Sequence, residues 1–95
     1  RAIEIDPNYA KAHYNLGALL EDHVKDFDSA AKAYRRVIEI DPNHAMAHWN
    51  LSLLLENQRG DLRGAIEATR GYIAAGNPDN DGEQRVEKLT KKMNA

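Results

Sequence analysis

The sequence contains no cysteine among its 95 residues. This absence excludes disulfide bonds, thiolate metal ligands and thiol nucleophiles. It also suits the reducing cytoplasm, which is where we expect the protein, although secreted proteins without cysteine exist as well.

The sequence also lacks long hydrophobic runs and a marked excess of either charge. No apolar run approaches the roughly 18 residues that a membrane-spanning helix requires. The net charge is only −2, and it conceals no long run of either sign, so neither a nucleic acid nor a membrane surface is expected as a partner. Hydrophobic residues make up 42% and charged residues 29% of the chain, which is typical of one folded domain rather than a disordered segment.

What the sequence does contain is an internal repeat. Residues 1–21 align without gaps on residues 36–56, at an offset of 35 residues that also relates Pro7 to Pro42. The same offset continues more weakly to the end of the chain. A repeat of this length is typical of helical hairpins that stack into a solenoid.

Each unit contains two segments in which apolar residues recur with helical spacing. The apolar face of the first segment, which we expect to lie in the core, consists of Ala12, Leu16, Leu19 and Leu20. The second segment should form a helix over residues 27–40 with Asp26 as its N-cap. The second unit should repeat this pattern with helices over residues 44–57 and 62–75, and a final charged helix should span residues 83–93.

Turn residues predict where these helices begin and end. The first helix should begin after Pro7 with Asn8 as its N-cap, because proline cannot continue a preceding helix. Gly76, followed by Pro78, should occupy a left-handed C-cap. We therefore predict an all-α chain, and because its first residues match the end of a second helix, we expect it to be part of a longer protein. The predicted divisions are the end of a preceding repeat (1–7), two units (8–42 and 43–77), and a turn with a capping helix (78–95).

The repeated residues resemble the tetratricopeptide repeat (TPR) family. The matching positions are Leu16, Gly17, Leu20, Ala30, Tyr34 and Val37 in the first unit and Leu51, Ser52, Leu55 and Ala65 in the second. The units depart from the family pattern in having 35 residues instead of 34, with the extra residue between the two helices. The resemblance implies a right-handed α-solenoid of stacked antiparallel helix pairs, which binds a partner peptide in a concave groove lined by the first helices.

In the TPR family, certain residues of the first helices face this groove. The corresponding candidate peptide-binding residues are Lys11, Tyr14, Asn15, Ala18, Met46, Trp49, Asn50, Leu53 and Arg85. Tyr14 and Trp49 would offer two aromatic platforms, and aromatic residues are enriched at binding hot spots. Asn15 and Asn50 resemble the start of the asparagine ladder of O-linked N-acetylglucosamine transferases, whose amides can pair with a peptide backbone. A basic cluster at one end of the chain could favour an acidic partner; it consists of Arg85, Lys88, Lys91 and Lys92. Asn and Tyr are also frequent at these positions across the family, and basic residues commonly form a solvated helix face, so a role without ligand contact stays open.

The remaining chemistry-bearing residues form no recognisable active site. His44 and His48 are four residues apart and could share a helix face, but no third metal ligand accompanies them. Ser52 lies one turn after His48, but no acidic residue is placed to orient the histidine. The six glycines are scattered and form no phosphate-binding loop. We therefore expect no enzyme activity, no cofactor and no metal.

Two other functions stay open at this point. Two units are fewer than the three or so repeats that usually stabilise a solenoid, and an N-terminal edge bearing Ile3 and Ile5 could stack on a second copy. The chain would then be a homo-oligomerisation module. It could also be the docking region of an enzyme, such as a glycosyltransferase, whose catalytic domain is absent from this sequence.

Overall fold

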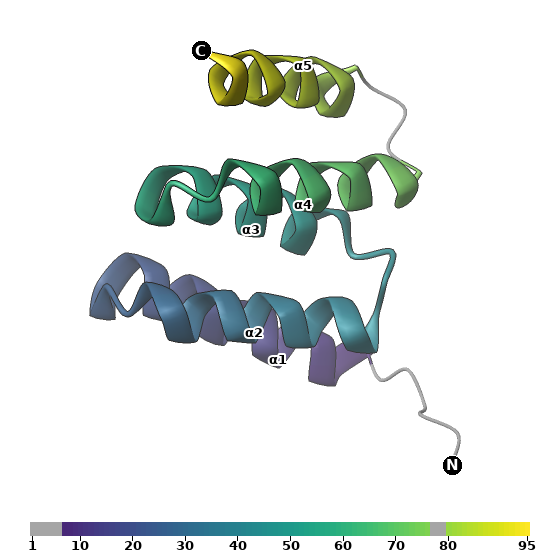
Figure 1. The fold of residues 1–95 in the computed structure, drawn as a ribbon. Coiled ribbons are helices and arrows are strands. Elements are labelled where there is room, and N and C mark those ends of the chain that lie inside the picture. Colours follow the sequence, from purple (N-terminus) through teal and green to yellow (C-terminus); the bar gives the residue numbers. More distant parts are fainter. Residues whose placement is uncertain (1–6, 77–79) are drawn as a thin grey trace.

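The computed structural model describes residues 7–76 and 80–95 as a stack of helices joined by short turns (Figure 1). The elements are the α-helices α1 (Pro7–Leu19), α2 (Phe27–Ile40), α3 (Ala45–Arg59), α4 (Leu62–Ala74) and α5 (Asp81–Asn94) and the π-helix η1 (Leu20–Val24). Helix α1 pairs with α2, α3 pairs with α4, and α5 packs on α4 at the far end of the stack. No strand occurs in these two ranges, and the expected all-α helical repeat fold is confirmed.

The helix boundaries follow from capping residues. Asp26 caps α2 as predicted, because its carboxylate accepts hydrogen bonds from the Ser29 backbone N–H at 3.1 Å and from the Ser29 hydroxyl at 2.8 Å. These hydrogen bonds lower the pKa of Asp26. Asp61 caps α4 in the same way, since it accepts from the Gly64 N–H at 2.9 Å. Gly76 has the predicted left-handed conformation, with φ at 87°.

Three predicted helix starts were wrong, and the predicted ends of α3, α4 and α5 differ from the observed ends by one or two residues. Helix α1 begins at Pro7, so Asn8 lies inside its first turn and does not cap it; proline is favoured at this first helical position. His44 precedes α3 as its N-cap instead of beginning the helix. Helix α5 begins at Asp81, two residues earlier than expected. The expected helix end at residues 1–6 and the predicted position of Pro78 lie outside the described residues.

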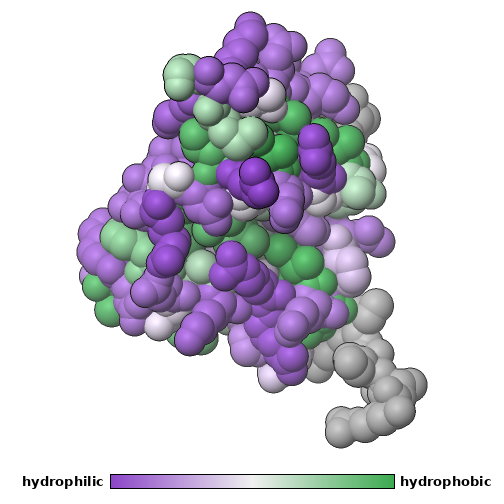
Figure 2. Space-filling view, in the orientation of Figure 1, coloured by the Kyte–Doolittle hydropathy of each residue, from purple (hydrophilic) through white to green (hydrophobic). Residues whose placement is uncertain are grey.

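The core runs along the contacts between the helix pairs. One cluster of buried residues includes Tyr34, Leu54 and Leu89, and a smaller one joins Ala10 and Val37. On the face shown in Figure 2, hydrophobic residues gather in seams between the helix layers, and hydrophilic residues cover the outer helix surfaces. None of the helices in the described ranges is long and apolar enough to cross a membrane.

The prediction that the apolar face of the first helix lies in the core was wrong for three of its four residues. Ala12, Leu16 and Leu19 are exposed, with exposed fractions of 45% for Leu16 and 49% for Leu19. The equivalent residues of α3 have exposed fractions of 0% for Ala47, 6% for Leu51 and 0% for Leu54. The difference arises because α2 packs on α3, whereas no described helix covers this side of α1.

The extra residue of each unit is accommodated where the first helix ends. The π-helix η1 follows α1, and its wider hydrogen-bonding pattern takes up one additional residue. Lys25 then adopts the left-handed conformation with φ at 62°, and its N–H donates to the Leu20 carbonyl. Gly60 ends α3 with φ at 64° and an N–H that donates to the Leu55 carbonyl. The two turns are equivalent, but only the second has the residue type that this conformation favours.

We expect replacement of Lys25 by Gly to raise the free energy of unfolding by about 1 kcal/mol, since a residue with a Cβ is strained in the left-handed region. Urea unfolding of the two proteins measures the change. Replacing Gly60 by Lys is the matched control, and it should destabilise the chain by a similar amount. If the urea concentration at the midpoint of unfolding were unchanged in both variants, the prediction would be contradicted.

Candidate functional site

The nine candidate residues fall into two groups, of which the first lies along one side of α1 and α3. Lys11, Asn15 and Met46 are exposed, and Ala18 and Leu53 are half-buried. Lys11 with Met46 and Ala18 with Leu53 occupy equivalent positions on α1 and α3. These two helices lie on the same side of the stack, behind α2 and α4 in Figure 1. We call this set of five residues the inner face.

The other four candidates are held by contacts with side chains of other helices. Asn50 donates from Nδ2 to the Tyr14 hydroxyl at 2.8 Å. The ring of Tyr14 also lies 5.1 Å from that of His44 and 5.9 Å from that of Tyr34. Tyr14 is therefore fixed between the first unit and the second. Asn50 already uses one amide hydrogen there, so the two asparagines of the expected ladder have different surroundings.

Trp49 and Arg85 form the corresponding contact between α3, α4 and α5. The Trp49 ring lies 4.7 Å from the Tyr72 ring, and the Arg85 guanidinium carbon lies 5.5 Å from the centre of the Trp49 ring. Arg85 has a side-chain exposure of only 8%, and its Nη2 forms an ion pair with Glu56 Oε1 at 2.9 Å. Its guanidinium therefore lies in the interior of the protein, paired with Glu56.

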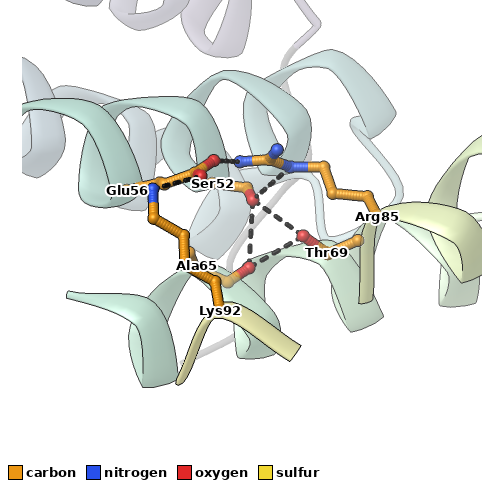
Figure 3. Close-up of polar contacts among 6 residues, drawn as sticks. All are labelled: Ser52, Glu56, Ala65, Thr69, Arg85 and Lys92. Carbon is orange, nitrogen blue, oxygen red and sulfur yellow. Dashed lines mark hydrogen bonds and ion pairs between the residues drawn. The ribbon is translucent and has the colours of Figure 1, made fainter. Parts of the chain in front are cut away.

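A buried polar cluster surrounds this ion pair (Figure 3). Arg85 Nε donates to Ser52 Oγ at 2.9 Å, and Ser52 Oγ lies 2.7 Å from Thr69 Oγ1. Thr69 in turn donates to the Ala65 carbonyl at 2.8 Å. One assignment of the hydroxyl hydrogens satisfies all three bonds, with Ser52 donating to Thr69. The cluster joins α3, α4 and α5, so it ties the final helix to the second unit.

Glu56 is the anionic centre of the cluster. Its side chain is only 7% exposed, and Lys92 Nζ lies 3.0 Å from its Oε2. Burial alone would raise the pKa of Glu56, but the neighbouring Lys92 and Arg85 outweigh this effect and hold the pKa below its ordinary value. Glu56 is therefore stabilised as a carboxylate.

In the first unit, different residues fill the equivalent space between the two helices. Tyr34, which stands where Thr69 does, donates from its hydroxyl to Glu21 Oε1 at 2.9 Å. Burial, followed by the contact with Glu21, raises the pKa of Tyr34. A Cβ at Gly17 would lie 2.8 Å from the Tyr34 ring, which explains the glycine there. In the second unit, Ser52 and Thr69 replace this pair and Arg85 fills the vacated space.

The sequence analysis missed the polar cluster. The sequence did contain a signal for it. Gly17 and Tyr34 of the first unit are a small residue facing a large one, whereas the equivalent Ser52 and Thr69 of the second unit are both small and both carry a hydroxyl group. Such a pair leaves room and two hydroxyl groups for a third polar side chain.

Three of the four histidines and Ser52 make structural contacts. His44 Nδ1 accepts from the Ala47 N–H at 3.1 Å and thereby caps α3. His48 is buried, with Nε2 2.8 Å from the Pro42 carbonyl, and a Cβ at Gly71 would overlap its ring. His13 packs edge-on against Tyr9 with ring centres 4.6 Å apart. Within residues 7–76 and 80–95, no group of three or more metal-ligating side chains comes together.

Comparison with protein families gives two matches. A family model described as tetratricopeptide repeat matches residues 24–80, and one described as TPR repeat matches residues 1–23. The chain belongs to the tetratricopeptide repeat family. TPR repeats generally mediate protein–protein interactions and are typically non-catalytic scaffolds. A search of curated proteins gives no match to this TPR chain.

Proposed function

We propose that this TPR protein is a cytoplasmic interaction scaffold that binds a partner polypeptide across its inner face. The observation that carries the proposal is the exposure of Met46, whose exposed fraction is 51%. Leu53 lies two helical turns further along the same side of α3. Methionine side chains adapt to differently shaped partners and are common at peptide-binding surfaces.

Lys11 and Asn15 would add polar contacts beside this apolar strip. Both are exposed on α1, and a side-chain amide can both donate to and accept from a peptide backbone. The contacts of Tyr14 with Asn50 and of Trp49 with Arg85 hold the supporting helices in place. We therefore assign ligand contact to the inner face and a positioning role to these four residues.

Selection of peptides from a random library on the purified chain, followed by titration of the selected peptide, tests this proposal. Met46→Glu should weaken binding by about tenfold, equivalent to about 1.4 kcal/mol, because a carboxylate replaces an apolar contact. Met93→Glu is the matched control, since Met93 is similarly exposed at 43% but lies near the end of α5. Equal binding by both variants would exclude the inner face as the binding site.

A further inference from the structure

A pocket between α2 and α4 lies on the opposite side of α3 from the inner face. Its volume is about 280 Å³, and α3 lines it with His48, Leu51 and Leu55. Leu51 stands two residues before Leu53 of the inner face, which corresponds to about half a helical turn. Helices α2 and α4 are in front in Figure 1, and on this side Figure 2 shows a seam of hydrophobic residues between the helix layers. The pocket is therefore separate from the proposed peptide-binding surface.

The floor of the pocket is apolar. Leu51, Leu55 and Ala68 are buried there, and Ile38 of α2 is half-buried beside them. Helix α4 contributes the small residues Gly64 and Ala68, which leave room next to α2. The volume lies just below the range of about 300–1,000 Å³ that is usual for sites of drug-sized ligands. The pocket therefore suits a small molecule with one apolar group rather than a helix or a long peptide.

Two residues of opposite charge stand at the mouth of the pocket. Arg35 of α2 and Glu67 of α4 line it, and both are exposed. In the part of the chain that the structure describes, neither side chain forms an ion pair or a hydrogen bond. The neighbouring Arg36, by contrast, pairs with Glu39 at 3.0 Å. Arg35 and Glu67 are therefore available to a ligand that carries both charges.

We propose that this pocket binds a free amino acid with a bulky apolar side chain. The side chain of the ligand occupies the apolar floor, where its burial favours binding. The α-carboxylate of the ligand pairs with Arg35, because a guanidinium group binds a carboxylate through two parallel hydrogen bonds. The α-ammonium group donates to the Glu67 carboxylate. The two charges thus select a zwitterion over a simple anion or cation.

Titration of the isotope-labelled chain with L-phenylalanine, followed by nuclear magnetic resonance, tests the ligand class. The backbone amide signals of Gly64 and Ala68 should shift and saturate, with a dissociation constant below about 1 mM. N-acetyl-L-phenylalanine lacks the ammonium group and L-phenylalaninamide lacks the carboxylate, so each should bind about tenfold more weakly. Free glycine, which has no apolar side chain, should cause no saturable shift.

Variants of the chain test which residues hold the ligand. Arg35→Gln and Glu67→Gln should each weaken L-phenylalanine binding by about tenfold, and both should remain folded because these side chains are exposed. Arg70→Gln is the matched control and should leave binding unchanged, since Arg70 is the equivalent of Arg35 in the second unit but does not line the pocket. Ala68→Leu should fill the pocket and abolish binding, with circular dichroism as the check that the variant is folded. The two glutamine variants decide the question if Ala68→Leu unfolds the chain.

Three results would overturn the proposal. The first is an absence of saturable shifts up to the stated limit. The second is equal binding by Arg35→Gln and Arg70→Gln, which would show that Arg35 does not hold the carboxylate. The third concerns N-acetyl-L-phenylalaninamide, which carries neither charge and resembles a phenylalanine within a polypeptide. If it bound as tightly as the free amino acid, the pocket would be a site for a side chain of a partner protein instead.

Discussion

Replacement of Glu56 by Gln is expected to lower the free energy of unfolding by about 3 kcal/mol. The substitution keeps the size of the side chain but leaves the Arg85 guanidinium without its counter-charge in a buried position, where each side chain is less than 10% exposed. Lys92 is 54% exposed and can return to water, so the loss comes mainly from Arg85. Chemical unfolding in urea measures the change, which is large beside the total stability of about 5–10 kcal/mol expected for a small domain.

The first unit provides a matched control for this substitution. Glu21 occupies the position equivalent to Glu56 but accepts a hydrogen bond from the neutral Tyr34 hydroxyl. Glu21→Gln should therefore cost only about 1 kcal/mol. Equal losses in the two variants would show that the ion pair of the second unit contributes no more than a neutral hydrogen bond.

The pH dependence of stability gives an independent measurement on the same residue. Because the pKa of Glu56 in the folded chain lies below its ordinary value of 4.5, the unfolded chain binds a proton there first as the pH falls. The stabilisation is fully present above this value and is lost as the pH drops through the lower, folded pKa. The difference between wild type and Glu56→Gln should therefore shrink below about pH 4.5.

Replacement of Leu54 by Ala is expected to cost about 3–4 kcal/mol, whereas Leu19→Ala should cost less than about 1 kcal/mol. The two leucines stand at equivalent positions of the repeat, but Leu54 is fully buried at 0% exposure and Leu19 is 49% exposed. Truncation of Leu54 leaves a cavity between α2, α3 and α4, and truncation of Leu19 leaves none. Urea unfolding of both variants provides the comparison.

The same pair of variants checks whether Leu19 is covered in solution. If Leu19→Ala were as destabilising as Leu54→Ala at all protein concentrations, Leu19 would have to be buried within the chain itself. That result would contradict the exposed fractions of the two leucines.

The sequence was sufficient to predict features whose causes are local. The range of α2, the cap at Asp26 and the left-handed Gly76 each depend on residues within one or two turns. The repeat itself could be found by self-comparison, and it led directly to the stacked helical hairpins. Helix α1 was harder to delimit, because Pro7 and Asn8 are both acceptable near a helix start.

Features that depend on distant residues were not predictable in the same way. The apolar stripe of α1 has the same pattern as that of α3, and only the placement of α2 decides which stripe is buried. The contact of Arg85 with Ser52 joins residues 33 positions apart. Arg85 was consequently interpreted as a groove residue, while its side chain turns into the interior.

The unlike polar contacts of the two units also restrict the order in which the helices can assemble. Tyr34 fills the space beside Gly17, whereas Thr69 and Ser52 leave room for Arg85. A chain rearranged so that α5 packed on the first unit would bring a guanidinium against the Tyr34 ring, beside a carboxylate that already accepts from the Tyr34 hydroxyl. Arg85 would then lose its hydroxyl acceptor and become a buried charge with fewer partners. The α5 helix is thus matched to the second unit alone, so the units of this solenoid are similar in shape but not interchangeable.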